Sequence, residues 1–251
     1  MNTHTNSDCP VFLVLGASGG IGAAACRSLV TSGATVAAAS RPSDRLDELA
    51  GELDVAKWNL DAAEPTAIES VISAVVERFG RLDGVANCVG SLLLKAANMT
   101  SFEEWDSVIA ANLTSSFAVV RSAAKVMRKH GGSIVLVSSA AARIGLANHE
   151  AIAAAKAGVI GLTLSAAATY AAKGIRVNAV APGLVRTPMT RRIWDNPRSA
   201  EASQAMHALG RLGEPDDVAS MIAWLLDPAN AWVTGQVIGI DGGLGSVRSR
   251  G

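Results

Sequence analysis

The chain has 251 residues, 49% of them hydrophobic, and its 22 lysines and arginines equal its 22 aspartates and glutamates in number. This length and apolar content predict one large core in a single domain. Because the charges balance, there is no basic field to attract nucleic acid or an anionic membrane, and a small-molecule substrate fits better. The cysteines Cys9, Cys26 and Cys88 share no metal-ligand spacing, so we expect free thiols, no bound metal and a cytoplasmic location.

The two ends of the chain differ in composition from the rest. Residues 1–9 are largely polar and lack the apolar core of a signal sequence, and the last few residues, 246–251, are mostly small or basic. We expect a disordered lead-in and a frayed tail around a folded domain at 10–245. We also expect no apolar run long enough to span a membrane.

A glycine-rich turn follows the first apolar run. Residues Val11 to Leu15 predict a buried strand, and a helical pattern runs from Ala23 to Ser32. The spacing Gly-x-x-x-Gly-x-Gly between them lets the backbone approach a pyrophosphate at the start of a helix, which indicates a dinucleotide site. A tight turn that only packs the helix closely is the structural alternative. The residues of this turn expected to contact the dinucleotide are Gly16, Ser18, Gly20, Ile21 and Gly22.

The second expected strand, Ala34 to Ala39, is followed by Ser40 and Arg41. In a dinucleotide-binding sheet the adenosine ribose lies at this point. A carboxylate there accepts from the 2′-hydroxyl of NAD, whereas a serine does not repel a 2′-phosphate and a guanidinium pairs with one through charge-assisted hydrogen bonds. The pattern favours NADP(H). NAD(H) is the alternative if Arg41 is an ordinary solvated loop residue.

The middle of the chain continues the alternation of strands and helices. Further strands are expected at 55–60, 84–89, 134–137 and 174–180, and helices at 64–79 and 101–129. Such alternation predicts a parallel, doubly wound α/β sheet with helices on both faces, because crossover connections are right-handed. Cys88 ends one of these strands, and with no basic neighbour in sequence we expect a small packing residue and not a nucleophile.

The segment after the strand at 134–137 carries several polar groups. Two hydroxyls, Ser138 and Ser139, stand at the strand end, and an alanine-rich helix follows with His149, Ile152 and Lys156 at spacings of three and four. Side chains at these spacings share one helical face. Hydroxyls that only cap local backbone are the structural alternative for the two serines.

Together these motifs resemble the short-chain dehydrogenase/reductase family over residues 10–245, and in pattern most closely its 3-oxoacyl-[acyl-carrier-protein] reductases. The matching segments are Gly16 to Gly22, Asn87 to Gly90, Ala111 to Thr114, Ser139, Lys156, Pro182 to Met189 and Asp241 to Gly243. The resemblance implies a Rossmann-type sheet of about seven strands, with the last strand at 235–243. It also implies an NAD(P)(H) cofactor and oxidoreductase activity on a C=O or CH–OH group.

The resemblance implies roles for particular residues. Ser139 would orient and polarise the carbonyl, Lys156 would bind the nicotinamide ribose, and Asn112 would hold a backbone carbonyl and a water that leads toward the lysine. Asn59 stands where the family has an aspartate that contacts adenine, and an asparagine can both donate and accept there. The other implied cofactor contacts are Leu60, Asn87, Gly90, Pro182, Gly183, Val185 and Thr187.

Ile152 stands where the family has its catalytic tyrosine. That tyrosine gives a proton to the reacting oxygen, and general acid catalysis of this kind contributes roughly 10²- to 10⁴-fold. Isoleucine supplies none of it. His149 is the tentative substitute, since an imidazole is a competent acid near neutral pH, although it lies about 4.5 Å nearer the helix start and a simple polar residue there is the alternative. Tyr170 lies roughly 27 Å along the same helix and cannot act.

Two classes of function follow from this altered motif. The first is an NADP-dependent ketoreductase that uses Ser139, Lys156, Asn112 and either His149 or water; a reductase of conjugated double bonds is a variant that needs no tyrosine at this position. The second is a dinucleotide-binding protein without turnover, which would serve as a structural or regulatory subunit.

Substrate and partner expectations rest on three segments. Residues 191–212 have few strand signals and are expected to form a mobile lid over a small carbonyl or acyl thioester substrate. The resemblance implies a homotetramer through the helices at 101–129 and 152–173 and the last strand. Lys129 and Lys173 match positions that dock an acyl carrier protein in similar reductases, with solvated lysines as the alternative.

Overall fold

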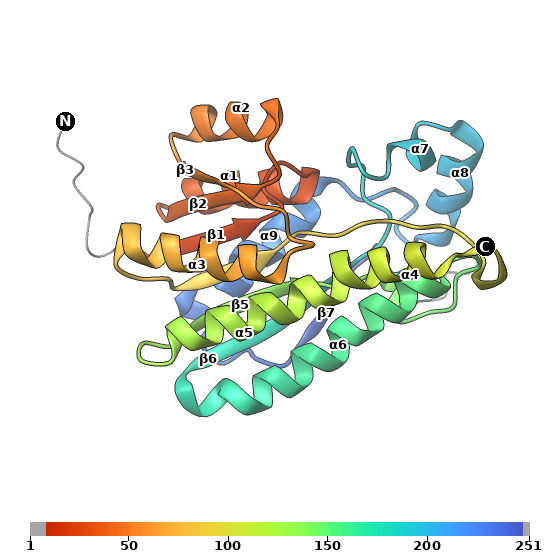
Figure 1. The fold of residues 1–251 in the computed structure, drawn as a ribbon. Coiled ribbons are helices and arrows are strands. Elements are labelled where there is room, and N and C mark those ends of the chain that lie inside the picture. The colour runs from red at the N-terminus through yellow and green to blue at the C-terminus, as the bar shows by residue number, and fades with distance from the viewer. Residues whose placement is uncertain (1–8, 248–251) are drawn as a thin grey trace.

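The computed structural model describes residues 9–247, and Figure 1 shows their fold. These residues form one sheet of seven strands in the order β3-β2-β1-β4-β5-β6-β7. The strands are β1 Val11–Leu15, β2 Thr35–Ser40, β3 Ala56–Asn59, β4 Gly84–Asn87, β5 Gly132–Val137, β6 Ile175–Pro182 and β7 Val237–Ile240. All neighbouring strands are parallel, which confirms the predicted sheet. The expected lead-in at 1–9 and tail at 246–251 lie almost wholly outside the described residues.

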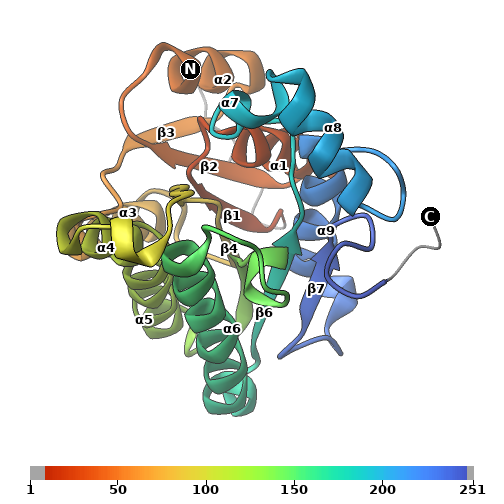
Figure 2. The same ribbon diagram turned by 90° about the vertical axis from the view of Figure 1, so that its right-hand side faces the viewer.

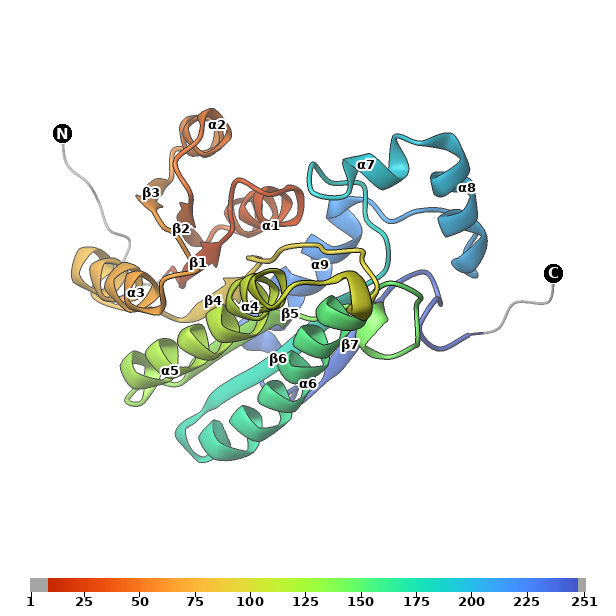
Figure 3. The same ribbon diagram turned by 45° about the vertical axis from the view of Figure 1, so that its right-hand side comes forward.

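Helices cover both faces of this sheet. Figure 3 shows α1 and α9 on one side and α3, α5 and α6 on the other. The α-helices are α1 Gly20–Thr31, α2 Asp44–Leu53, α3 Pro65–Phe79, α4 Phe102–Ile109, α5 Ser115–Met127, α6 Glu150–Tyr170, α7 Arg191–Trp194, α8 Pro197–Met206 and α9 Pro215–Leu226. Short turns of other helix types are η1 Ala97–Met99, η2 Ala110–Thr114, η3 Ala140–Ala142, η4 Ala171–Lys173 and η5 Pro228–Asn230.

The sheet separates two apolar cores. Along β1, Leu13 and Leu15 belong to the core shared with α3, α5 and α6, whereas Phe12 and Val14 belong to the core shared with α1 and α9. Successive side chains of a strand point to opposite faces, so a strand covered on both sides must be apolar throughout. This is why the central strands read as continuous apolar runs and could be predicted from the sequence.

The helix expected at 101–129 is interrupted in the structure. Helices α4 and α5 are joined by η2, a π-helical turn that contains Asn112. A π-helical turn inserts a residue into an α-helix and is frequent at functional sites. The helical spacing of apolar residues predicted the two helices but gave no sign of the turn between them.

The segment at 191–212 is helical and projects from the body of the fold. It contains α7 and α8, which lie on the side of α1 and α9, across from α4 and α6 (Figure 2). Neither α7 nor α8 buries any of its own residues. Helix α9, which follows the segment, was not predicted, although the proline at its first position and its buried Val218 and Ile222 are typical of a packed helix.

Helix α6 corrects one expectation. Together with η4 it forms a helical segment, Glu150–Lys173, that is long and apolar enough to cross a membrane by length and composition. The expectation that no run reaches such a length is therefore wrong, because alanine and glycine count as apolar although they are small. In the structure α6 packs against β6 and β5, and 44% of its most apolar window is buried inside the molecule. It is a core helix.

Candidate active site

The glycine-rich turn between β1 and α1 forms a tight backbone cradle. A Cβ atom added to Gly22 would lie 2.2 Å from the carbonyl oxygen of Gly16, and one added to Gly20 would lie 2.9 Å from Cγ2 of Thr187. Gly16 has a φ of 78°, a region that favours glycine. Among the described residues no side chain caps the N-terminus of α1, so its first N–H groups remain for an anion. The turn fits the pyrophosphate of a dinucleotide.

The end of β2 meets the same turn. The hydroxyls of Ser18 and Ser40 lie 2.6 Å apart in a hydrogen bond in which either can donate. Ser40 is buried, while Arg41 next to it is exposed. The backbone N–H of Leu60 donates to the carbonyl oxygen of Ser40 at 2.8 Å, which brings the end of β3 to this edge, with Asn59 exposed beside it. The residues expected around the adenosine are thus brought together.

The end of β4 approaches the start of α5 through Asn87. Asn87 is buried, its Nδ2 donates to Oγ of Ser116 at 3.2 Å, and its Oδ1 accepts from the N–H of Val89 at 3.3 Å. A Cβ atom added to Gly90 would lie 2.9 Å from Oδ1 of Asn112 and 3.5 Å from Nζ of Lys156. Gly90 therefore brings the backbone after β4 close to both polar side chains.

Asn112 is fully buried and all its polar atoms are engaged. Its Oδ1 accepts from the backbone N–H of Ser91 at 3.2 Å, and its Nδ2 donates to Oγ of Ser91 at 3.0 Å and to the carbonyl oxygen of Val108 at 2.9 Å. Its own carbonyl accepts from Oγ of Ser116 at 2.7 Å. The π-helical turn thus places an amide that locks the segment after β4 onto α4.

Lys156 projects from α6 to the end of β5. Its Nζ donates to the carbonyl oxygen of Val137 at 2.7 Å, and Ser138 Oγ donates back to the carbonyl oxygen of Lys156 at 2.8 Å. The lysine is only 7% exposed, and burial lowers its pKa from 10.5 to about 8. Ser139 follows, and its Oγ accepts from the N–H of Ala141 at 3.2 Å. That bond leaves the hydroxyl proton of Ser139 to be donated elsewhere.

Ile152 occupies an apolar environment one turn before Lys156. It is 4% exposed and belongs to a small cluster with Val108, Ala151 and Ala155, against which Leu93, Ile109 and Leu113 pack. Each member of this cluster is aliphatic. Isoleucine carries no acidic proton, so Ile152 itself cannot act as a general acid.

His149 does not lie on the helical face where we expected it. Helix α6 begins at Glu150, and His149 is its N-cap residue with φ −115° and ψ 11°. Its Nδ1 lies 2.7 Å from the carbonyl oxygen of Ala147, so the ring turns back toward the preceding loop. The expectation that His149 shares a helical face with Ile152 and Lys156 was wrong. Residues at helical spacing share a face only when all of them lie inside the helix.

Cys88 acquires a basic neighbour that the sequence did not indicate. The ammonium of Lys156 interacts with it across the fold. Burial nevertheless raises the pKa of the Cys88 thiol to about 12, which outweighs the lowering by Lys156. The thiol stays protonated, in agreement with the expectation that Cys88 is a packing residue and not a nucleophile.

The loop after β6 brings a residue that sequence reasoning missed. Pro182, Gly183, Val185 and Thr187 follow one another along this edge, and Val185 and Thr187 are buried. The ring of His207, which comes directly after α8, lies against them: a Cβ atom added to Gly183 would be 2.5 Å from its Nε2. Nothing in the local sequence marks His207, because the contact joins segments more than 20 residues apart.

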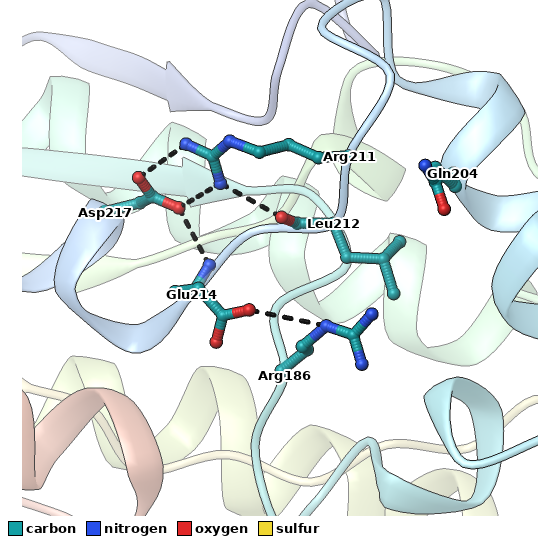
Figure 4. A pocket seen from close by; sticks show the side chains of 6 residues that line it. All are labelled: Arg186, Gln204, Arg211, Leu212, Glu214 and Asp217. Carbon is teal, nitrogen blue, oxygen red and sulfur yellow. Dashed lines mark hydrogen bonds and ion pairs between the residues drawn. The ribbon is translucent and has the colours of Figure 1, made fainter.

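A cavity of about 380 Å³ lies at the base of the segment at 191–212 (Figure 4). Its charged lining is paired: Arg186 binds Glu214 at 3.3 Å, and Arg211 binds Asp217 through two contacts of 2.6 and 2.8 Å. Since Arg186 precedes α7 and Arg211 follows α8, these pairs tie both ends of the segment to the start of α9. The cavity thus lies where the lid meets α9, and its lining includes neither Lys156 nor Ser139.

Comparisons with known proteins agree with this geometry. A family model described as enoyl-(acyl carrier protein) reductase matches residues 16–245. The 3-oxoacyl-[acyl-carrier-protein] reductase FabG of Thermotoga maritima is 39% identical over 244 residues, covering 93% of this chain and 97% of that protein. The D-threitol dehydrogenase of Mycolicibacterium smegmatis is 34% identical over 242 residues, covering 94% and 93%. A crystal structure of an actinorhodin polyketide ketoreductase variant with NADPH has a TM-score of 0.90 at 32% identity, covering 96% and 99%. The chain belongs to the short-chain dehydrogenase/reductase family of oxidoreductases.

Proposed function

We propose that this protein is a cytoplasmic NADP(H)-dependent ketoreductase that acts on a small ketone or a 3-oxoacyl thioester. The observation that carries the proposal is the convergence, at one edge of the sheet, of the glycine cradle, the free hydroxyl proton of Ser139 and the buried ammonium of Lys156. The similar 3-oxoacyl-[acyl-carrier-protein] reductase and polyketide ketoreductase support the substrate class.

The preference for NADP(H) over NAD(H) rests on the end of β2. Ser18 and Ser40 present two hydroxyls there, and the exposed guanidinium of Arg41 stands beside them. Hydroxyls and a guanidinium suit a 2′-phosphate, whereas NAD selection usually relies on a carboxylate at this point. The similar ketoreductase with NADPH supports the same choice.

The proton comes from Lys156 in this proposal. When bound, the reduced dinucleotide supplies a hydride to the carbonyl carbon. Ser139 donates a hydrogen bond to the carbonyl oxygen, and an N–H bond of the Lys156 ammonium breaks as the new O–H bond forms, leaving a neutral amine that solvent reprotonates. The pKa of about 8 makes this ammonium a stronger acid than an ordinary lysine, and only one of its three protons is held by Val137. Asn112 keeps the segment after β4 in place beside it.

The candidate acid His149 is weaker on geometric grounds. Its ring is bound to the carbonyl of Ala147 before the helix begins, whereas Lys156 lies at the ends of β4 and β5. His149 therefore stays a tentative residue that substitution can test.

A specific observation favours a second candidate, a dinucleotide-binding protein without turnover. Ile152, at the position where the resemblance implies a tyrosine, is buried and packs in an aliphatic cluster. A reductase of conjugated double bonds is the further alternative, which the description of the matching family model supports.

One experiment separates these functions. NADPH oxidation is followed with 3-oxoacyl thioesters, simple ketones, quinones and enones, while calorimetry measures NADPH and NADH binding. Turnover of the thioesters or ketones supports the ketoreductase, and turnover of enones alone supports the double-bond reductase. Tight NADPH binding without any turnover supports the binding protein. No affinity for either nucleotide would contradict all three.

A homotetramer is part of the proposal. Phe102 on α4, Phe117 on α5 and Leu164 on α6 are 85%, 55% and 52% exposed, which is unusual for large apolar side chains on packed helices. These helices are those through which the family resemblance implies association. An acyl carrier protein is the proposed macromolecular donor of substrate, with Lys129 and Lys173 as its docking residues. Sedimentation of the protein alone tests whether it forms a homotetramer.

A further inference from the structure

His207 is the one buried polar residue in the lid, residues 191–212. Its relative exposure is 3%, and the only other buried residue of this segment is Leu212 at its end. It directly follows α8, a helix that buries none of its own residues. This side chain is therefore a buried polar link between the end of α8 and the body of the protein, beside the backbone bond from Leu209 to Gly242.

Both ring nitrogens of His207 are engaged by backbone groups from different segments. Nδ1 lies 2.7 Å from the carbonyl oxygen of Ser203 in α8, and Nε2 accepts from the backbone N–H of Leu184 at 3.1 Å. A carbonyl can only accept and an amide N–H can only donate, so Nδ1 carries the proton and Nε2 offers its lone pair. The two partners thus select one neutral tautomer, and the ring bridges α8 to the loop after β6.

The space around the ring is closed by glycines. A Cβ atom added to Gly183 would lie 2.5 Å from Nε2 of His207, and one added to Gly242 would lie 3.4 Å from its Cβ. The chain around the ring is also fixed, because the N–H of Leu209 donates to the carbonyl of Gly242 at 3.0 Å. The imidazole therefore fits into a slot between the end of β6 and the turn after β7.

The far side of this bridge is the loop that the cofactor is expected to contact. Leu184 lies between Gly183 and Val185, and Val185 pairs with Gly213 at the other end of the lid. The imidazole thus links the loop at Leu184 directly to α8, while Trp194 of α7 donates separately to the carbonyl oxygen of Thr187 in the same loop. We propose that His207 is a positioning residue that couples the lid to the cofactor-binding loop and so sets the shape of the substrate site. The kinetic part of this inference rests on the proposed reductase function.

Three variants distinguish the hydrogen bond to Leu184 from the hydrogen bond to Ser203. His207→Gln places an amide near the position of Nε2 and retains the bond to Leu184. His207→Asn retains the bond to Ser203, and His207→Ala loses both bonds. His130→Ala, at an exposed histidine, is the matched control. For His207→Ala we expect KM for the carbonyl substrate to rise about tenfold with kcat within about threefold, because the bridge orders the lid and does not touch the reacting atoms. The amide variants are expected to fall between wild type and His207→Ala.

Limited trypsin digestion tests the same bridge without catalysis. Arg191, Arg192 and Arg198 are exposed in the lid, and Arg128 is exposed at the end of α5. We expect His207→Ala to speed cleavage at the lid arginines about tenfold, with cleavage at Arg128 unchanged. Wild-type lid cleavage and KM in all three variants would overturn the proposal, as would an equal rise at Arg128, which would indicate global destabilisation. Because digestion needs no substrate, a protein without turnover would refute the reductase and leave this test intact.

Discussion

The glycine-rich turn between β1 and α1 and the candidate catalytic residues on α6 are built in different ways. At the glycine turn the backbone itself forms the site, and a single Cβ atom at Gly22 would lie 2.2 Å from a carbonyl oxygen. On α6 the site depends on side chains, and there Ile152 has joined an aliphatic cluster. The first region has every glycine of its motif, while the second has isoleucine at the position where the resemblance implies a catalytic tyrosine.

This difference teaches that binding and proton transfer are physically separable on this fold. Dinucleotide binding needs a backbone shape and free N–H groups, which depend on many residues together. Proton transfer depends on one group at one position, and Ile152 at the implied position is buried among aliphatic side chains. The predictions below test whether the two regions are as independent as this comparison indicates.

The largest effect is expected from restoring the phenol. Ile152→Tyr should raise the rate of ketone reduction by roughly 10²- to 10⁴-fold, because it returns a general acid to the position from which the family donates. Ile152→Phe adds the ring without the hydroxyl and should give no gain. Steady-state rates with NADPH measure both, and an equal gain in the two variants would mean that ring size and not acidity limits the reaction.

A loss of binding is expected at the other region. Gly22→Ala should weaken NADPH binding at least about 100-fold, since the added methyl group forces the cradle open. Gly51→Ala is the matched control, because a Cβ atom at Gly51 in α2 meets nothing within 4 Å. Calorimetry compares the two, and unchanged affinity in Gly22→Ala would show that the turn does not bind the nucleotide.

Lys156 links the two regions and predicts a pH dependence. Its pKa is 10.5 in its ordinary state and about 8 when buried, so between these values the unfolded chain holds a proton that the folded chain has released. Lys156 should therefore contribute a rise in stability with pH across this window, of roughly 3 kcal/mol for the full difference. Over the same rise the rate of reduction should fall, because the ammonium is lost.

The variant Lys156→Met isolates this group. Urea unfolding at about pH 7 and about pH 10 should show that wild type gains stability relative to the variant over this rise in pH. The comparison is needed because the Cys26 and Cys88 thiols, whose pKa burial raises to about 12, oppose the gain in both proteins. The variant should be the more stable protein at pH 7. Its NADPH affinity and turnover should both fall at least about tenfold. If stability depends on pH in the same way in both proteins, a group other than Lys156 accounts for that dependence.

A smaller effect is expected at the end of β2. Arg41→Ala should weaken NADPH binding about tenfold and leave NADH binding unchanged, because only NADPH carries the 2′-phosphate. Arg128→Ala, at an exposed arginine beyond α5, is the control for a general loss of charge. Competition between the two nucleotides measures the ratio, and an equal loss for both would remove Arg41 from cofactor selection.

The smallest effect is expected at His149. His149→Ala should change the rate at neutral pH by less than about twofold, because the ring is bound to Ala147 before the start of α6. A loss of about tenfold or more, with unchanged NADPH affinity, would instead make His149 the acid and displace Lys156 from that role.

Much of the fold could be read from the sequence because local patterns and tertiary demands agree. The apolar run of β1, the glycine turn after it and the start of α1 each predict the same βα unit. The interruption of α4 and α5 by η2 could not be read, since Asn112 is held there by Ser91, which is distant in the sequence, as well as by Val108 on α4. His149 was misplaced for a related reason, because the point where α6 begins depends on the preceding loop.

The sequence by itself determined the parallel sheet, the nucleotide-binding turn and the absence of a tyrosine at position 152, since each follows from spacing along one segment. Only the tertiary structure decided that Lys156 is buried with a lowered pKa beside Cys88, and that His207 joins the lid to the loop at Leu184. These contacts join residues far apart in the chain. Desolvation and hydrogen bonding act through space, and no local pattern records which distant segments will meet.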